Sequence, residues 1–157
     1  MLARDGVPEK EDIERILPPL TRRTKKAYVV VECFQEIPCD PCFESCPFGA
    51  FKPFKEIKDL PEVDFDKCNG CGSCIPFCPG LAIFVVDETN PEYDLISIPY
   101  EFLPSPRKGE KGKGLNREGE IVCEAEVVRF RNMKNKTHIL TLRVPKGMGN
   151  IVRHYRP

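Results

Sequence analysis

Eight of the nine cysteines in this 157-residue chain fall into two short runs, and this repeat constrains the chain more than any other feature of its sequence. The second run is Cys68-Asn-Gly-Cys71-Gly-Ser-Cys74-Ile-Pro-Phe-Cys78-Pro79, a C-x2-C-x2-C-x3-C-P pattern. A shift of 32 residues brings the first run onto it, aligning Cys39, Cys42, Cys46, Pro47 and Ala50 with Cys71, Cys74, Cys78, Pro79 and Ala82. Because only two units are present, the repeat predicts a pseudo-two-fold pair rather than a solenoid.

The spacing within the second run suits the binding of a metal centre by thiolates. Three cysteines separated by two residues each let one tight loop present three thiolates, and Gly70 and Gly72 permit the backbone angles that this loop requires. The N-terminus lacks the apolar segment of a secretory signal, and without one, metal ligation is a better interpretation of nine cysteines than disulfides. The sequence therefore predicts a metal-binding protein of the reducing cytoplasm.

Residues 27–86 resemble the bacterial ferredoxins that hold two [4Fe–4S] clusters, through both cysteine runs, the preceding strand and the apolar segments that follow. In that family the fourth cysteine of each run, which precedes a proline, serves the other cluster. The resemblance implies transfer of electrons rather than catalysis, with no catalytic residue. It also implies two ligand sets, which are Cys33, Cys39, Cys42 and Cys78 for cluster 1, and Cys68, Cys71, Cys74 and Cys46 for cluster 2.

The first run departs from the family pattern, because five residues rather than two separate Cys33 from Cys39. We expect Cys33 to be a ligand, since the repeat requires one there and no spare cysteine lies nearby. If its loop cannot reach, that site would hold a [3Fe–4S] cluster or a labile fourth iron. Two structural zinc sites would also use eight thiolates, but zinc ribbons contain separated cysteine pairs. The ninth cysteine, Cys123, is expected to be a small buried hydrophobe.

The segments around the runs predict an α+β fold, in which a ferredoxin-like two-[4Fe–4S] pseudo-two-fold repeat carries a short N-terminal helix and a small C-terminal antiparallel β unit. The helix is expected within residues 8–17, a polar loop over 104–114, and strands over 28–31, 93–100, 121–130 and 137–144. No apolar run is long enough to span a membrane. The expected divisions are an N-terminal extension (1–26), the two-[4Fe–4S] domain (27–90) and a basic C-terminal β extension (91–157).

The net charge of zero conceals a strong asymmetry along the chain. Residues 1–106 contain 11 Lys and Arg against 19 Asp and Glu, a net charge of −8, and residues 107–157 contain 13 against 5, a net charge of +8. A basic segment can bind nucleic acid, but no RNA-binding or helix-turn-helix pattern accompanies it. A surface that faces an acidic protein partner, or simply a solvated face, is the plainer interpretation.

Two segments are similar to a more specific group. ECFQEIPCDPCFESCPFGAF (32–51) and GEIVCEAEVVRFRNMKNKTHILTLRVPK (119–146) resemble the ferredoxin-like small subunits of multi-subunit flavin-dependent amino-acid or amine dehydrogenases, such as the prokaryotic proline and hydroxyproline dehydrogenase complexes. This resemblance implies a hetero-oligomer with an FAD-containing dehydrogenase subunit and a downstream electron acceptor. Two alternatives stay open, which are a freestanding soluble ferredoxin that serves several enzymes and an iron–sulfur structural or nucleic-acid-associated module.

Overall fold

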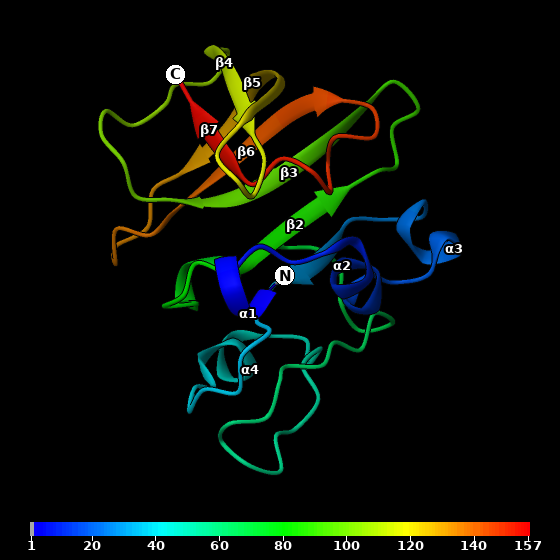
Figure 1. The fold of residues 1–157 in the computed structure, drawn as a ribbon. Coiled ribbons are helices and arrows are strands. Elements are labelled where there is room, and N and C mark those ends of the chain that lie inside the picture. Colours follow the sequence, from blue (N-terminus) through cyan, green and yellow to red (C-terminus); the bar gives the residue numbers. More distant parts are fainter. Residues whose placement is uncertain (1) are drawn as a thin grey trace.

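The computed structural model describes residues 2–157, and for Ala3 the backbone only. Within these residues seven strands form one antiparallel sheet in the order β1-β2-β3-β6-β5-β4-β7 (Figure 1). The strands are β1 (Tyr28–Val31), β2 (Ile83–Asp87), β3 (Tyr93–Tyr100), β4 (Lys111–Leu115), β5 (Ile121–Arg131), β6 (His138–Pro145) and β7 (His154–Arg156). The helices are short, namely α1 (Leu2–Asp5), α2 (Lys10–Ile16), α3 (Leu20–Arg23), α4 (Pro41–Ser45) and the 3-10 turn η1 (Ile75–Phe77).

The predicted α+β class is confirmed, as are the expected helix and the four expected strands. The helix α2 begins after Glu9, whose backbone N–H donates to the side chain of Asp12 as in a capping box. The expected loop over 104–114 is wrong in its last part, where β4 begins. Gly112 and Gly114 made this segment look like a loop, but a Cβ at Gly112 would lie 2.3 Å from the carbonyl oxygen of Arg156. Glycine is there because β7 packs closely on β4.

The strands β1 and β2 are buried on both faces, which explains their continuous apolar sequences. One face, with Tyr28, Val30, Phe84 and Val86, belongs to the core of the sheet. The opposite face, with Val29, Val31, Ile83 and Val85, packs against the cysteine segments. These two strands therefore join the sheet to the cysteine-rich half of the molecule.

The sheet curls around its own core, so that its two ends are joined by side chains. Arg153, just before β7, and Arg117, just after β4, both donate to the carboxylate of Glu32, which follows β1. Asn150 donates to the hydroxyl of Tyr28 at 2.6 Å. Breaking such a buried ion pair by removing one partner typically costs about 3–5 kcal/mol, so this network holds the curvature of the sheet.

The cysteine segments lie on the far side of β1 and β2 from the rest of the sheet, together with α4 and the long loop before residue 62 (Figure 1). The loop between β5 and β6 reaches down to them, because Asn135 donates to the carbonyl oxygen of Pro76 at 2.7 Å. In the part of the chain that the structure describes, no helix is long and apolar enough to cross a lipid bilayer.

Candidate metal centres

Two separate pockets each have four cysteines in their walls. One pocket is lined by Cys46, Cys68, Cys71 and Cys74, and the other by Cys33, Cys39, Cys42 and Cys78. These are the two sets that the exchange of the fourth cysteine predicts, although whether they bind clusters stays a prediction. Among residues 2–157 no three His, Cys, Asp or Glu side chains are close enough to hold one metal ion, so the thiols are spread around each pocket.

The floors of both pockets come from one pair of strands. Val29 pairs with Val85 across β1 and β2, and both line the pocket of Cys68. Val31 pairs with Ile83 in the same ladder, and both line the pocket of Cys33. The two pockets are thus neighbours, with floors that lie two residues apart along the strands, about 7 Å.

The second run folds as its glycines require. Gly70 and Gly72 both have positive φ, at +71° and +76°, in the left-handed region that favours glycine. Gly70 also lies so close to Ala27 that a Cβ on Gly70 would be 2.5 Å from the Cβ of Ala27. Cys68 and Cys74 are buried, and Cys71 is exposed at the surface of the loop.

An arginine that the sequence analysis did not single out holds this loop in place. The guanidinium of Arg22 donates to the carbonyl oxygen of Cys68 at 2.7 Å, and also to those of Phe65, Lys26 and Ala27. On the other side Arg131 donates to the carbonyl oxygen of Cys71 at 3.3 Å. Both arginines lie far from the run in sequence, so no local pattern could have found them.

The three extra residues between Cys33 and Cys39 do not keep Cys33 from the other thiols of its pocket. Its loop is tied down where the N–H of Cys39 donates to the carbonyl oxygen of Ile57 at 3.1 Å. Pro41 then begins α4, which places Cys42 in the wall of the pocket. Cys33 therefore lines the same pocket as Cys39, Cys42 and Cys78.

The ends of the two runs have the same local structure. The N–H of Ala50 donates to the Sγ of Cys46 at 3.3 Å, and the N–H of Ala82, 32 residues later, donates to the Sγ of Cys78 at 3.4 Å. The residues before these alanines, Gly49 and Leu81, both have positive φ, at 60° and 52°. Leu81 adopts an angle that is uncommon for a branched side chain, which indicates that the turn imposes it.

Burial dominates the electrostatics of the free thiols. It raises the pKa of Cys74 to about 12 and that of Cys42 to about 11, and neighbouring thiols of the same pocket add to the effect. Burial and the neighbouring Cys78 also raise the pKa of Cys33. Since iron binds the thiolate, bound metal would have to supply the positive charge that these pockets lack.

The remaining candidates lie outside the two pockets. Cys123 is half-buried in β5 and packs against the core of the sheet, as expected for a small hydrophobe. His138 is buried and accepts a hydrogen bond from the N–H of Met133, and His154 stacks on Tyr100. The structure brings neither histidine to a thiol pocket.

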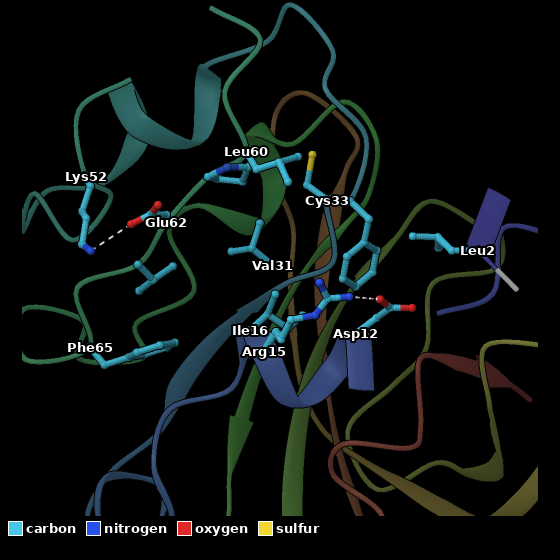
Figure 2. Close-up of a pocket in the computed structure, with 13 residues that line it drawn as sticks. Leu2, Asp12, Arg15, Ile16, Val31, Cys33, Lys52, Leu60, Glu62 and Phe65 are labelled. Carbon is cyan, nitrogen blue, oxygen red and sulfur yellow. Dashed lines mark hydrogen bonds and ion pairs between the residues drawn. The ribbon is translucent and has the colours of Figure 1, made fainter. Parts of the chain in front are cut away.

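A third cavity, of about 490 Å³, lies beside Cys33 and opens between the N-terminal helices and the loop of residues 52–65. Figure 2 shows Cys33, Val31 and two ion pairs among the side chains that line it. These pairs are Arg15 with Asp12 and Lys52 with Glu62. Among the described residues, Cys33 is thus the only thiol of its pocket that also lines this open cavity.

The donor set of each pocket fits an iron–sulfur cluster. Four thiols from two runs line each pocket, apolar side chains form the floor, and each pocket contains a thiol whose Sγ accepts a backbone N–H. Such N–H donors are common around the sulfur atoms of iron–sulfur clusters. Thiolate sulfur also suits zinc, so the donor type alone does not choose the metal.

Comparison with known proteins bears on this choice. A family model described as "4Fe-4S binding domain" matches residues 61–84, which include Cys68, Cys71, Cys74 and Cys78. A ferredoxin of Streptomyces griseus is 30% identical over 100 residues, which are 61% of this chain and 92% of that protein. The chain belongs to the ferredoxin family. The first cysteine run of this chain lies outside the residues that the family model matches, so the number of clusters stays a prediction.

Other relatives match this chain over only part of their own length. A selenate reductase subunit of Mesobacillus selenatarsenatis is 31% identical over 153 residues, which are 91% of this chain and 44% of that protein. The ferredoxin-type protein NapF of Haemophilus influenzae is 36% identical over 66 residues, 40% of this chain and 38% of that protein. The chain thus spans less than half the length of these two relatives. No solved structure matches it.

Proposed function

We propose that this ferredoxin relays single electrons through two [4Fe–4S] clusters as a non-catalytic subunit of a flavin-containing oxidoreductase complex. The observation that carries the proposal is the pair of neighbouring pockets, each lined by four thiols drawn from both cysteine runs. Cys33, Cys39, Cys42 and Cys78 would hold cluster 1. Cys68, Cys71, Cys74 and Cys46 would hold cluster 2.

When bound, iron–sulfur clusters supply reversible one-electron chemistry, and the protein supplies their position and surroundings. The apolar floor of β1 and β2 keeps water from one side of each pocket. The N–H groups of Ala50 and Ala82 offset negative charge on Cys46 and Cys78. Arg22 and Arg131 fix the loop that carries Cys68 and Cys71.

The relatives support membership of a larger assembly. The relative that matches almost the whole of this chain is named as a subunit of selenate reductase. The flavin-containing dehydrogenase partner rests on the resemblance of residues 32–51 and 119–146 to the small subunits of such complexes. In this proposal residues 27–90 carry the clusters, and the extensions 1–26 and 91–157 contact partner chains.

A freestanding ferredoxin in the cytoplasm is the second candidate. It is favoured by the match to a ferredoxin of which this chain covers 92%. The two candidates differ in what accompanies the chain, because a subunit is recovered with a flavoprotein and a free carrier is not.

The test is anaerobic purification of the tagged chain from its native host, followed by assay of iron, sulfide, zinc and flavin. About eight irons per chain, with a signal of reduced clusters in the EPR spectrum after dithionite, would support the two-cluster proposal. A copurifying flavoprotein would support the complex, and its absence would favour the free carrier. Zinc without sulfide would refute electron transfer.

A further inference from the structure

Of the nine cysteines, all of which the structure describes, Cys71 alone is exposed. It lines the pocket of Cys46, Cys68 and Cys74 and also reaches the molecular surface. The loop around it, residues 69–80, contains no charged side chain. The charge near Cys71 is therefore set by the segments that flank this loop.

The loop between β5 and β6 flanks it on one side and is strongly basic. Residues 129–136 contain four Lys and Arg and no Asp or Glu. The hydrogen bond from Arg131 to the carbonyl oxygen of Cys71 and the bond from Asn135 to that of Pro76 attach this segment to the cysteine loop. Lys134 and Lys136 are exposed on either side of Asn135.

A second basic segment, residues 22–26, also contacts the loop. Gly70 packs on Ala27, and Arg22 donates to the carbonyl oxygen of Cys68, so this segment and the cysteine loop are in direct contact. Lys25 and Lys26 are exposed there. Acidic groups are present near Cys68 as well, where Asp64 pairs with Lys67 and Asp66 is exposed.

The first cysteine run has the opposite charge. Between Cys33 and Cys46 the chain carries Glu36, Asp40 and Glu44 and no Lys or Arg. The two cysteine runs thus differ in charge, and the loop of residues 52–62 that borders the first run carries equal numbers of basic and acidic side chains.

We propose that the surface around Cys71 docks an acidic electron-transfer protein. We call this surface the basic face and define it by Lys25, Lys26, Arg131, Lys134 and Lys136. Exposed aromatic side chains next to it supply apolar contact, because Phe48 lines the same pocket and Phe77 lies in η1. The inference rests on the proposed function, in that the pocket of Cys71 holds a cluster, and it adds the place and the charge of the partner.

Cytochrome b5 serves as an acidic probe and cytochrome c as a basic probe, and both are used with the purified holoprotein. A carbodiimide joins a lysine amine to a carboxylate in direct contact, so mass spectrometry of the cross-linked complex maps the docked lysines. We expect cross-links from cytochrome b5 to Lys134 and Lys136, and none at Lys55 or Lys58. Cytochrome c, which lacks an acidic face, should not cross-link through these lysines.

The second measurement is the rate at which the dithionite-reduced protein reduces ferric cytochrome b5, one electron leaving the protein for each haem reduced. The variant Lys134→Glu/Lys136→Glu should slow this reaction roughly ten-fold at low ionic strength and less than about two-fold at 0.5 M salt, because salt screens exposed charges. The control variant Lys55→Glu/Lys58→Glu makes the same change of charge in an exposed loop away from Cys71 and should change the rate less than about two-fold.

The proposal is overturned if cross-links map to residues 52–62, or if both double variants slow the reaction equally. An EPR redox titration of Lys134→Glu/Lys136→Glu distinguishes weaker docking from a changed reduction potential. A slower rate that is explained by a shifted reduction potential would also overturn the proposal. Iron and sulfide content are assayed on every sample. If the purified wild type contained no iron and sulfide, the proposed function would be refuted. If it contained full iron but Lys134→Glu/Lys136→Glu did not slow the reduction of cytochrome b5, only the basic face would be refuted.

Discussion

Replacing Gly70 by alanine tests how closely the cysteine loop packs against Ala27, the residue before β1. The substitution adds one methyl group at a residue with φ of +71°, and that methyl group would lie 2.5 Å from the Cβ and 2.6 Å from the carbonyl carbon of Ala27. The backbone angle alone costs about 1–2 kcal/mol for a residue with a Cβ. Overpacking against Ala27 adds about 1–3 kcal/mol, so we expect a total loss of about 2–5 kcal/mol.

Gly119→Ala is the matched control for this substitution. Gly119 has a similar φ of +82°, but a Cβ there would meet nothing within 4 Å. It should therefore show only the backbone cost. In anaerobic thermal unfolding we expect the melting temperature to fall by roughly 10 °C for Gly70→Ala and by roughly 4 °C for Gly119→Ala. The iron content should fall only in Gly70→Ala. Equal shifts and full iron in both variants would refute the argument that Ala27 crowds this loop.

Three further predictions concern other groups. Cys33→Ala should lower the iron content from about eight to about seven per chain and give the EPR signal of an oxidised three-iron cluster, and an unchanged content would remove Cys33 from the ligands. Arg22→Met should destabilise the protein by about 3 kcal/mol in urea unfolding, because four carbonyl oxygens lose their donor, whereas the exposed control Arg15→Met should have little effect. For Glu88, burial alone would raise the pKa, but Arg23 and Tyr28 hold it below its usual value. The carboxylate therefore stabilises the fold above about pH 4 and loses this effect as the pH falls through its lowered pKa. The wild type should unfold with about 2 kcal/mol more free energy than Glu88→Gln at pH 7. This difference should disappear in acid, where the carboxyl group is protonated. A constant difference would contradict this.

Local patterns in the sequence predicted much of the fold. The β-branched run at Tyr28–Val31 and the alternation over 137–144 predicted strands that the structure contains as β1 and β6, because period and residue type are local properties. The three-residue strand β7 was missed, since it is too short to show a period and forms only by pairing with β4. The strand β4 was mistaken for a loop because its glycines serve contact with β7 rather than a turn.

The candidate sites divide in the same way. The two sets of four cysteines were predicted from spacing and family pattern, and the structure gathers each set around one pocket. The residues that support these pockets were not predicted. Arg22 and Arg131 reach the second run from 46 and 60 residues away, and such contacts depend on tertiary packing that a single sequence does not display.

The ladder between β1 and β2 also sets where this chain can change in length. Because Val29 and Val85 lie under one pocket and Val31 and Ile83 under the other, a one-residue insertion in either strand would turn Tyr28 and Val30, or Phe84 and Val86, toward the thiols and damage both pockets together. An insertion in the loop after Cys33 leaves this ladder untouched, and the chain already carries three more residues there than in the second run. The paired strands thus fix the distance between the two pockets. Changes in length are tolerated in the loops that carry the cysteines, and we expect related sequences to differ there.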